Sequence, residues 1–324
     1  MTPNISARSG AQLQEAVRKP KALGRDARVA VFSPASPGSE AKVAAGVVEL
    51  RRLGFAAEMP GPRQPEGYFA ASAESRRAEF VNLLNDAGID ALVGSRGGYG
   101  SNYLLDASLA SSVNEPKVLM GFSDLASLQI FLWQQRRWVT FYGPMAGAGL
   151  DGGADAQSGY DEKSMRASLG ETEHGWSTSL HGEVLVAGDA EGRLLGGAMT
   201  IVEATFGTPW ELDTRGAILI LEDRGMKPYQ VDRVLMHFQQ AGKLDGVAGI
   251  VLGDFPDCEP PVAGSPMVRD ICLRILGKLG VPVVFGAPIG HTMRPMLTLP
   301  LGVKARLRAK GHGTLDILEA AVTR

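Results

Sequence analysis

Short apolar runs that stop abruptly at turn residues recur along this chain, and they constrain its fold more than any other feature. Runs of this length between turns are typical of buried parallel strands. Helical stretches separate them, at about 39–53, 72–87 and 125–135, and again near Met199, Val231 and Met267. This alternation predicts βαβ units and an α/β fold. The strands are expected at 28–32, 91–93, 118–121 and 138–142, and near Phe55, Val184, Ile218, Ile250 and Val283.

The alternation is interrupted once, and a length of 324 residues favours two domains or one large one. The interruption, from about Met145 to Ser179, is rich in Gly, Asp, Ser and Glu, as inter-domain connections often are. We therefore expect a flexible N-terminus at 1–24, an N-terminal domain at 25–148, a linker at 149–180 and a C-terminal α/β domain at 181–324.

The bulk properties exclude several classes of protein. A formal net charge of −2 gives no electrostatic reason to expect a nucleic acid or an anionic membrane as partner. No run of about 20 apolar residues exists, and the first 24 residues lack the apolar core of a secretory signal. The two cysteines, Cys258 and Cys272, imply no disulfide framework. We expect a cytoplasmic protein.

Three strand ends carry reactive side chains: Ser123, Glu222 and His291. Open α/β sheets place their chemistry beyond the carboxyl ends of parallel strands. A serine hydroxyl needs a base to become a nucleophile, and a histidine base needs a third group to hold its tautomer. The three residues therefore predict the triad of a serine hydrolase. The chain order matches the α/β-hydrolases, although Leu125 stands where their G-x-S-x-G elbow has its second glycine.

Glycines near the serine indicate an oxyanion hole. Gly121 permits a tight turn from the strand into the following helix, which would direct the backbone N–H of Asp124 towards a substrate oxygen. A second N–H, that of Gly98, is expected from the Gly97-Gly98 pair, because residues without side chains allow close approach.

Each of these residues also has a structural interpretation. A serine before an aspartate at a strand end is commonly a helix cap. The pair Glu222-Asp223 can be a solvated loop, and His291 after Pro-Ile-Gly can be a turn residue. Composition and spacing alone leave both interpretations open.

A set of ordered motifs decides between the two interpretations: Arg96-Gly97-Gly98-Tyr99-Gly100, Gly121-Phe122-Ser123-Asp124, Leu221-Glu222-Asp223, Tyr229-x-x-Asp232-Arg233 and Pro288-Ile289-Gly290-His291. Spanning roughly residues 28–318, the set resembles the LD-carboxypeptidase family, serine peptidase family S66, which also contains microcin-immunity peptidases. In that family, the serine of G-[FY]-S-D is the nucleophile, which implies that role for Ser123. The glutamate and histidine of the triad fall on Glu222 and His291.

The resemblance implies a Rossmann-like N-terminal domain that carries the serine, a C-terminal α/β domain that carries Glu and His, and an active site in the groove between them. It implies a homodimer and a reaction without metal or cofactor. The expected reaction is hydrolysis of the L,D-amide bond that releases terminal D-alanine from murein tetrapeptides. A peptidase for peptidyl or aminoacyl nucleotides, and a non-catalytic muropeptide-binding module, are the alternatives.

Substrate recognition is expected at the loop of Arg96, Gly97 and Tyr99. The guanidinium of Arg96 can bind a terminal carboxylate, or it can brace its own loop. Similar proteins often have His where this chain has Tyr142 and Asn where it has Ala198, which bears on substrate preference. Tyr229, Asp232 and Arg233 share one helix face, and we expect them to form a hydrogen-bonding cluster behind Glu222.

The remaining signals are weaker. Gly147-x-Gly149-x-x-Gly152 matches a dinucleotide-binding fingerprint, but no helix is expected directly after it, so we predict a flexible loop. Neither an H-E-x-x-H helix nor a P-loop sequence is present. The other histidines lack companions with the spacing of metal ligands and are expected to be surface or packing residues: His174, His181, His237 and His312.

Overall fold

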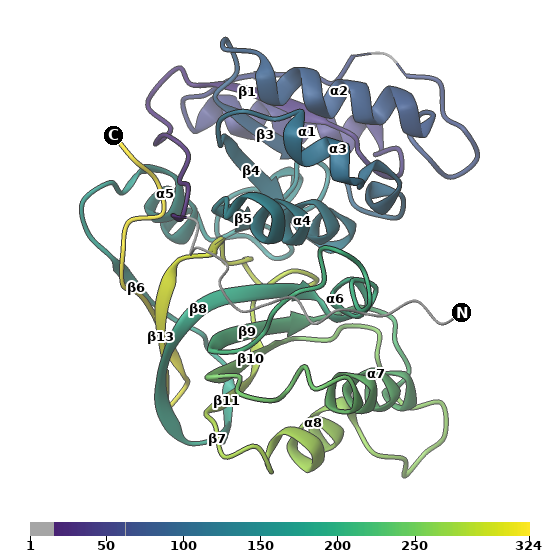
Figure 1. Ribbon diagram of the computed structural model, residues 1–324, viewed down its shortest axis with the longest axis vertical. Helices are drawn as coiled ribbons and strands as arrows, with labels where there is room; N and C mark the ends of the chain where they lie inside the picture. Colours follow the sequence, from purple (N-terminus) through teal and green to yellow (C-terminus); the bar gives the residue numbers. More distant parts are fainter. Residues whose placement is uncertain (1–15, 62) are drawn as a thin grey trace, which may run out of the picture.

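Two sheets stacked along the long axis form the molecule in the computed structural model, which describes residues 16–61 and 63–324 (Figure 1). The first sheet has the order β12-β5-β4-β3-β1-β2, and all its neighbouring strands are parallel except β12 and β5. Its strands are β1 (Arg28–Phe32), β2 (Ala56–Glu58), β3 (Ala91–Gly94), β4 (Val118–Gly121), β5 (Thr140–Tyr142) and β12 (Leu299–Leu301). Its helices are α1 (Glu40–Arg52), α2 (Ala73–Asn85), α3 (Ala107–Ser111) and α4 (Ala126–Arg136), with short 3-10 turns η1 (Ser101–Leu104) and η2 (Ser123–Leu125).

The second sheet has eight strands in the order β6-β14-β13-β8-β9-β10-β11-β7. Its centre, β8 to β11, is parallel, and its flanks are antiparallel. The strands are β6 (Trp176–Ser179), β7 (Glu183–Val186), β8 (Gly188–Ala198), β9 (Ala217–Glu222), β10 (Gly249–Gly253), β11 (Val283–Ala287), β13 (Lys304–Ala309) and β14 (Thr314–Ile317). The helices are α5 (Glu162–Gly170), α6 (Met199–Glu203), α7 (Pro228–Gln240) and α8 (Val268–Leu276), and η3 (Leu150–Gly152) precedes α5.

The α/β architecture is confirmed, and burial explains which strands the sequence revealed. Strands β4 and β9 are buried at every position, as expected of continuous apolar runs inside a parallel sheet. The first half of β8 alternates between partly buried and exposed residues, and β14 alternates between partly buried and fully buried ones. Because these strands have one solvated face, they lack long apolar runs, and the sequence did not reveal the antiparallel flank that they form.

The chain crosses between the two halves of the molecule more than once. Strand β12, which follows the C-terminal α/β segment, returns to the first sheet and pairs with β5, Leu299 opposite Tyr142. The predicted linker at 149–180 contains α5, which packs against β12, and β6, which is an edge strand of the second sheet. This segment is therefore a structural part of both halves, not an irregular connection.

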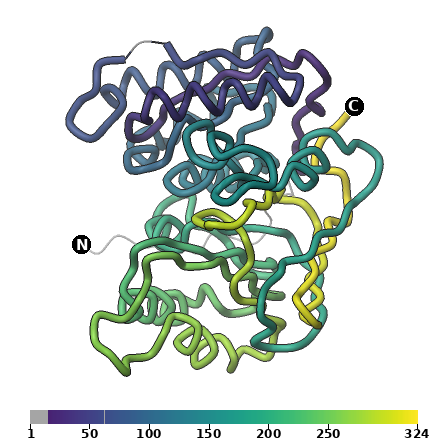
Figure 2. Tube along the Cα trace, turned by 180° about the vertical axis from the view of Figure 1, so that it is seen from behind, coloured from purple at the N-terminus to yellow at the C-terminus, as the bar shows by residue number. Residues whose placement is uncertain are grey.

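The expected flexible N-terminus, 1–24, falls partly outside the described residues, because 1–15 are not described. Residues 16–24 differ from the expectation, since backbone hydrogen bonds hold them to the body of the protein. Arg18 N–H donates to the carbonyl of Arg137, and Ala22 N–H donates to that of Thr323. Figure 2 shows this first described segment beside the C-terminal end of the chain.

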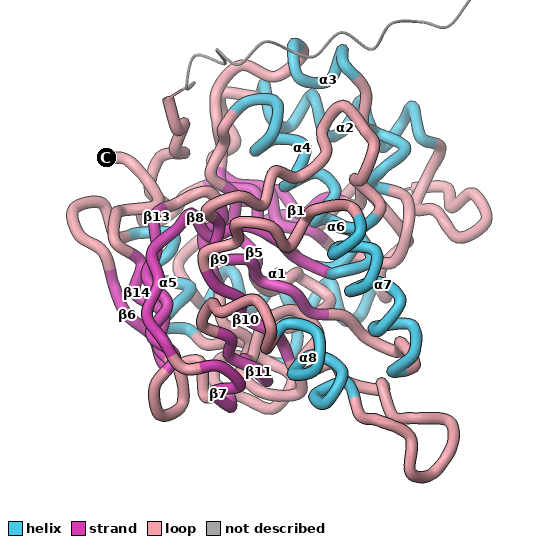
Figure 3. The backbone as a smooth tube through the Cα atoms, turned by 60° about the horizontal axis from the view of Figure 1, so that its bottom comes forward, coloured by secondary structure: helices cyan, strands magenta, loops and turns pink. Residues whose placement is uncertain are grey.

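One apolar cluster extends through both halves. It joins Leu119 and Phe141 of the first sheet to Ile220 and Val251 of the second, with all four side chains fully buried. Helix α4 contacts both β5 and β8, so it lies between the sheets (Figure 1). The two sheets are thus held in a fixed relation at the place where β4, β5 and β9 end. Figure 3 shows α6, α7 and α8 next to one another on one side of the second sheet. None of the described helices has the length and apolar character needed to cross a membrane.

Candidate active site

Ser123 lies at the carboxyl end of β4 in a backbone conformation that residues other than glycine rarely adopt. Its φ is +62°, in the left-handed region that favours glycine. The following residues turn directly into η2 and α4. Neither helical segment has a side-chain cap, so the helix-cap interpretation of Ser123 is wrong. A non-glycine residue held in such a conformation is typical of functional sites.

The glycine loop covers Ser123 as expected. A Cβ atom added at Gly97 would lie only 3.0 Å from Ser123 Oγ and 3.5 Å from the amide nitrogen of Asp124. Within the described chain, the N–H groups of Asp124 and Gly98 have no backbone acceptor. The absence of a side chain at Gly97 therefore leaves room for a substrate oxygen close to both groups.

Glu222 and His291 form a direct pair. The backbone N–H of His291 donates to Glu222 Oε2 at 2.9 Å, and Nδ1 lies 2.9 Å from the same oxygen. Because a carboxylate only accepts, Nδ1 carries the hydrogen, and Nε2 is left with its lone pair. Glu222 is fully buried, which excludes the solvated-loop interpretation.

Gly290 makes this pair possible. Its φ is +58°, and a Cβ atom at this position would lie 2.3 Å from the carboxyl carbon of Glu222. Only a glycine lets the chain pass close enough for both His291 groups to reach one carboxylate oxygen. His291 is therefore a fixed partner of the carboxylate, not merely a turn residue.

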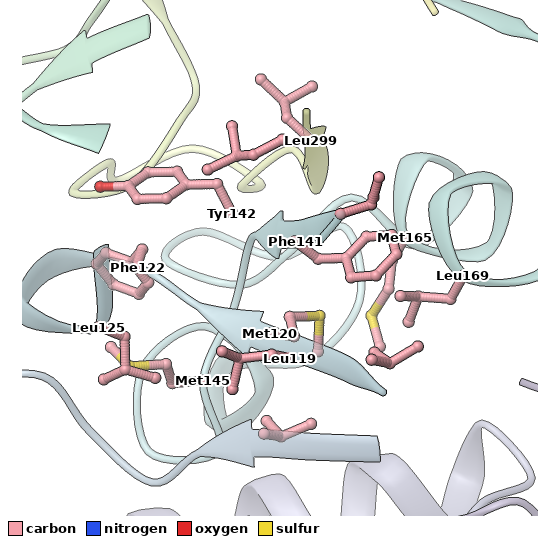
Figure 4. Packing of buried hydrophobic residues seen from close by; sticks show 14 of the residues in the cluster. Leu119, Met120, Phe122, Leu125, Phe141, Tyr142, Met145, Met165, Leu169 and Leu299 are labelled. Carbon is pink, nitrogen blue, oxygen red and sulfur yellow. The ribbon is translucent and has the colours of Figure 1, made fainter. Parts of the chain in front are cut away.

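Tyr142 is the site residue that sequence reasoning missed. Its hydroxyl donates to Glu222 Oε1 at 2.5 Å and accepts the backbone N–H of Ser123 at 3.4 Å. Figure 4 shows its ring beyond β5, close to the ring of Phe122. The departure from the family pattern at this position was expected to affect substrate preference, but the residue contacts the carboxylate itself. The other departure, Ala198, pairs in register with Glu222 across β8 and β9.

The imidazole of His291 packs against Phe122, the residue before Ser123, and is not hydrogen-bonded to the serine. The ring of Phe122, the residue before Ser123, packs edge-on against His291 with centroids 5.1 Å apart. The structure has no hydrogen bond between the described side chains of Ser123 and His291. Ser123 is connected to the pair through its backbone and Tyr142, and catalytic contacts of this kind often tighten only with substrate bound.

Burial and neighbouring charge both shift the pKa values of the ionisable groups at this site. Burial lowers the pKa of His291, but the charge and hydrogen bond of Glu222 outweigh it, so the pKa is raised overall. Burial, followed by the charge of Glu222, holds the pKa of Tyr142 well above its usual value, so the phenol stays protonated and can donate. Burial also raises the pKa of Asp124, whose carboxylate accepts the N–H of Ser101 at 2.8 Å.

The predicted recognition residues lie on the outer side of this centre. Arg96 is exposed, and its guanidinium donates to the carbonyl of Pro37 at 3.2 Å. Tyr99 is 42% exposed and forms one aromatic cluster with Tyr68, Phe69 and Tyr103. The loop therefore presents both a cation and aromatic rings to solvent next to Ser123.

The helix cluster expected behind Glu222 and the loop expected at Gly147–Gly152 can both be located in the structure. Asp232 forms an ion pair with Arg274 of α8 at 2.5 Å, and Arg233 lies over the ring of Tyr229, so this cluster joins two helices instead of supporting Glu222. The residue after Glu222, Asp223, accepts hydrogen bonds from both the backbone N–H and the hydroxyl of Thr200. The Gly147–Gly152 segment forms turns and η3. No group of three or more potential metal ligands occurs among the described residues.

Fold and site together define a two-domain α/β protein whose candidate centre lies where the two sheets meet. The LD-carboxypeptidase N-terminal domain matches residues 29–143, and the C-terminal domain of the same family matches residues 191–307. These matches cover most of the chain, which belongs to the LD-carboxypeptidase family, peptidase S66.

Three relatives represent the two branches of the family. A Bacillus subtilis protein named probable murein peptide carboxypeptidase is 33% identical, with 94% of this chain and 95% of the relative covered. The structure of muramoyltetrapeptide carboxypeptidase from Oxalobacter formigenes matches with a TM-score of 0.76 and 28% identity, covering 90% of this chain and 99% of that one. MccF in complex with glutamyl sulfamoyl guanosine matches with a TM-score of 0.83, covering 94% and 99%, and at 22% identity it shows the shared fold alone.

Proposed function

We propose that this protein is a serine carboxypeptidase that removes the terminal D-alanine from murein-derived tetrapeptides by cleaving an L,D-amide bond. The observation that carries the proposal is the strained Ser123 directly after Phe122, whose ring packs on the His291 imidazole, together with the buried carboxylate of Glu222 that holds Nδ1 of that imidazole. The murein carboxypeptidase relative, which matches over nearly the whole chain, supports this substrate class.

In the proposed reaction, Ser123 Oγ attacks the carbonyl carbon of the scissile amide while His291 Nε2 accepts the hydroxyl proton. The N–H groups of Asp124 and Gly98 stabilise the oxyanion. The intermediate then collapses, the C–N bond breaks, and His291 protonates the departing amine of D-alanine. His291 then accepts a proton from water as the water attacks the acyl-enzyme, and it returns the proton to Ser123 Oγ when the shortened peptide leaves. Glu222 stabilises the imidazolium at each step.

For substrate recognition, we assign the terminal carboxylate to Arg96. Its guanidinium uses one nitrogen on the carbonyl of Pro37, which leaves its other N–H groups directed at solvent beside the glycine loop. The exposed ring of Tyr99 offers an apolar surface on the same loop. The loop thus offers a small peptide both a positive charge, on Arg96, and an apolar ring, on Tyr99.

The second candidate function is hydrolysis of peptidyl or aminoacyl nucleotides. It is favoured by the MccF relative from Escherichia coli, which is 26% identical over 84% of this chain. The same Ser123, Glu222 and His291 would act, but the group released would be large. A muropeptide-binding module without catalysis is the third candidate, although a binding module would not require the pairing of Glu222 with His291.

Mass spectrometry of L-Ala-γ-D-Glu-meso-diaminopimelyl-D-Ala incubated with the protein tests the proposal. We expect the wild type to release D-alanine and Ser123→Ala to lose several orders of magnitude in kcat while keeping its thermal unfolding midpoint. Ser111→Ala, at an exposed serine of α3, is the control and should keep full activity. If the wild type releases no D-alanine but hydrolyses an aminoacyl sulfamoyl adenylate, the nucleotide function replaces the murein one.

A further inference from the structure

A single phenol connects the two halves of the candidate site. Tyr142 ends β5 in the first sheet, and Glu222 ends β9 in the second, yet the two side chains are hydrogen-bonded. The ring of Tyr142 is fully buried. It is the only described side chain whose hydrogen bonds reach both the nucleophile's backbone and the carboxylate of the histidine pair.

The direction of this chain of hydrogen bonds is fixed. The N–H of Ser123 can only donate, so the phenol oxygen accepts at 3.4 Å. The phenol hydrogen is then free to be donated to Glu222 Oε1. The other carboxylate oxygen accepts both groups of His291. Glu222 therefore has three donors, and Tyr142 is the only one that does not belong to the histidine.

This occupancy also restricts the oxyanion hole. The N–H of Ser123 is directed to the phenol, so it is not available to a substrate oxygen. The candidate donors that remain are the N–H groups of Asp124 and Gly98, neither of which has a backbone acceptor among the described residues. The hydrogen bond to Tyr142 thus orients the backbone of Ser123. It also leaves stabilisation of an oxyanion to the N–H groups of Asp124 and Gly98.

We propose that Tyr142 is a positioning residue that holds Ser123 in its strained conformation and sets the basicity of the Glu222–His291 pair. This inference deepens the serine peptidase function proposed above and rests on it. A donor to the carboxylate withdraws negative charge from it, which weakens its pull on the imidazolium. Removal of the phenol hydroxyl should therefore make the His291 imidazolium harder to deprotonate.

The groups that face His291 are few. They are Glu222, Asp223 and Arg224 from the end of β9 and the turn after it, with Tyr142 acting from β5 through Glu222. Asp223 uses its oxygens on Thr200 and on the N–H of Arg224. A change confined to the phenol hydroxyl consequently alters one donor and leaves the other charges in place.

The test is Tyr142→Phe, with the titration of His291 followed by proton NMR and assigned by comparison with His291→Gln. The chain has five histidines, which keeps the spectrum simple. We expect the titration midpoint of His291 to rise by about half a unit to one unit, since loss of the donor strengthens the attraction of the carboxylate for the imidazolium and only part of that change reaches the imidazole. The kcat for the murein peptide should fall about tenfold or more, with KM within about twofold. The acid limb of kcat/KM should move to higher pH by the NMR shift.

Tyr160→Phe is the matched control. Tyr160 is also fully buried, and its hydroxyl donates to Glu49, far from the site in the sequence and bonded to none of its residues. It should lower thermal stability in a similar way without moving the His291 titration. If Tyr142→Phe also leaves the His291 titration unchanged, the tyrosine only packs, and the inference is overturned.

A second variant keeps the test decisive if Tyr142→Phe does not fold. Site-specific replacement of Tyr142 by 3-fluorotyrosine makes the phenol a stronger donor with almost the same shape. The His291 titration should then move to lower pH, opposite in sign to the effect of removal. A shift upward or none at all would contradict the proposal. Since the titration requires no turnover, it decides the role of Tyr142 even if the wild type proves inactive on the murein peptide.

Discussion

At the scale of single residues, close backbone approach decides the geometry of the site. Gly290 lets the chain pass the carboxyl group of Glu222, and Gly97 leaves the space above Ser123 open. The reactive side chains could not hold their positions if either glycine had a side chain. The P-x-G-H motif therefore contains a steric requirement as well as the proposed base, His291.

Gly290→Ala should separate this steric effect from backbone strain. A Cβ atom there lies against Glu222, so we expect a loss of about 3 kcal/mol or more of unfolding free energy, and loss of activity. Gly280 is the matched control, because its φ is also positive, at +70°, and no atom lies within 4 Å of an added Cβ. Gly280→Ala should cost about 1–2 kcal/mol in denaturant unfolding and keep activity. Equal losses in both variants would contradict the steric argument.

The pH dependence of activity follows from His291. The base must be neutral, so kcat/KM should fall as the pH drops through the raised pKa of His291, above its ordinary value of about 6.5. In Glu222→Gln the burial remains and the negative charge is lost, so the acid limb should move to lower pH while kcat decreases. Glu203→Gln removes the carboxylate beside exposed His237 and should leave the pH–rate profile unchanged.

The same pair contributes to stability with a defined sign. A raised pKa in the folded state means that His291 binds its proton more tightly there than in the unfolded chain. Its contribution is therefore fully present below about pH 6.5 and is lost as the pH rises through the folded pKa. Urea unfolding at a series of pH values should show this loss in the wild type, and Glu222→Gln should remove it.

At the scale of elements, a buried arginine anchors the glycine loop. Arg76 of α2 donates to the carbonyls of Pro34 and Gly100, and its guanidinium lies 4.7 Å from the centre of the Phe69 ring. The following N–H, that of Ser101, donates to Asp124. The loop over Ser123 is thus tied both to a helix and to the residue after the nucleophile.

Arg76→Met should loosen this loop. Two buried carbonyls would lose their donor, so we expect a loss of about 3 kcal/mol in unfolding free energy and a fall in kcat/KM as Gly98 leaves its position. The neighbouring residue in the same helix offers the control. Arg77 pairs with Asp106, and Arg77→Met should cost about 1 kcal/mol or less and leave kcat/KM unchanged. Unchanged kinetics in Arg76→Met would show that the loop needs no such anchor.

The sequence predicted those helices and strands that can be recognised from the residues within a single segment. The apolar runs of β4 and β9 and the helices between them follow from periodicity, and Ser123, Glu222 and His291 fall at the strand ends where parallel sheets carry their functional residues. Tyr142 could not be found in this way, since it reads as the last apolar residue of a strand and its partner is in the other sheet. The pairing of β12 with β5 is equally non-local.

At the scale of the whole molecule, the two sheets share one apolar cluster, and β12 belongs to the sheet of the other half. We therefore expect a single cooperative transition in calorimetry, with equal calorimetric and van't Hoff enthalpies. An isolated fragment of residues 16–148 would lack β12 and expose part of the cluster, so it should give a poorly dispersed NMR spectrum. Two separate transitions in the full chain would contradict this expectation.

The return of β12 has a consequence for how the protein comes into being on the ribosome. Ser123 is synthesised well before Glu222 and His291, and the edge of its own sheet is completed only by Leu299–Leu301. A nascent chain therefore carries Ser123 before its proposed partners and its sheet are complete. The proposed peptidase activity should accordingly arise only after β12 has been made, so shorter nascent chains should be unable to cleave other proteins.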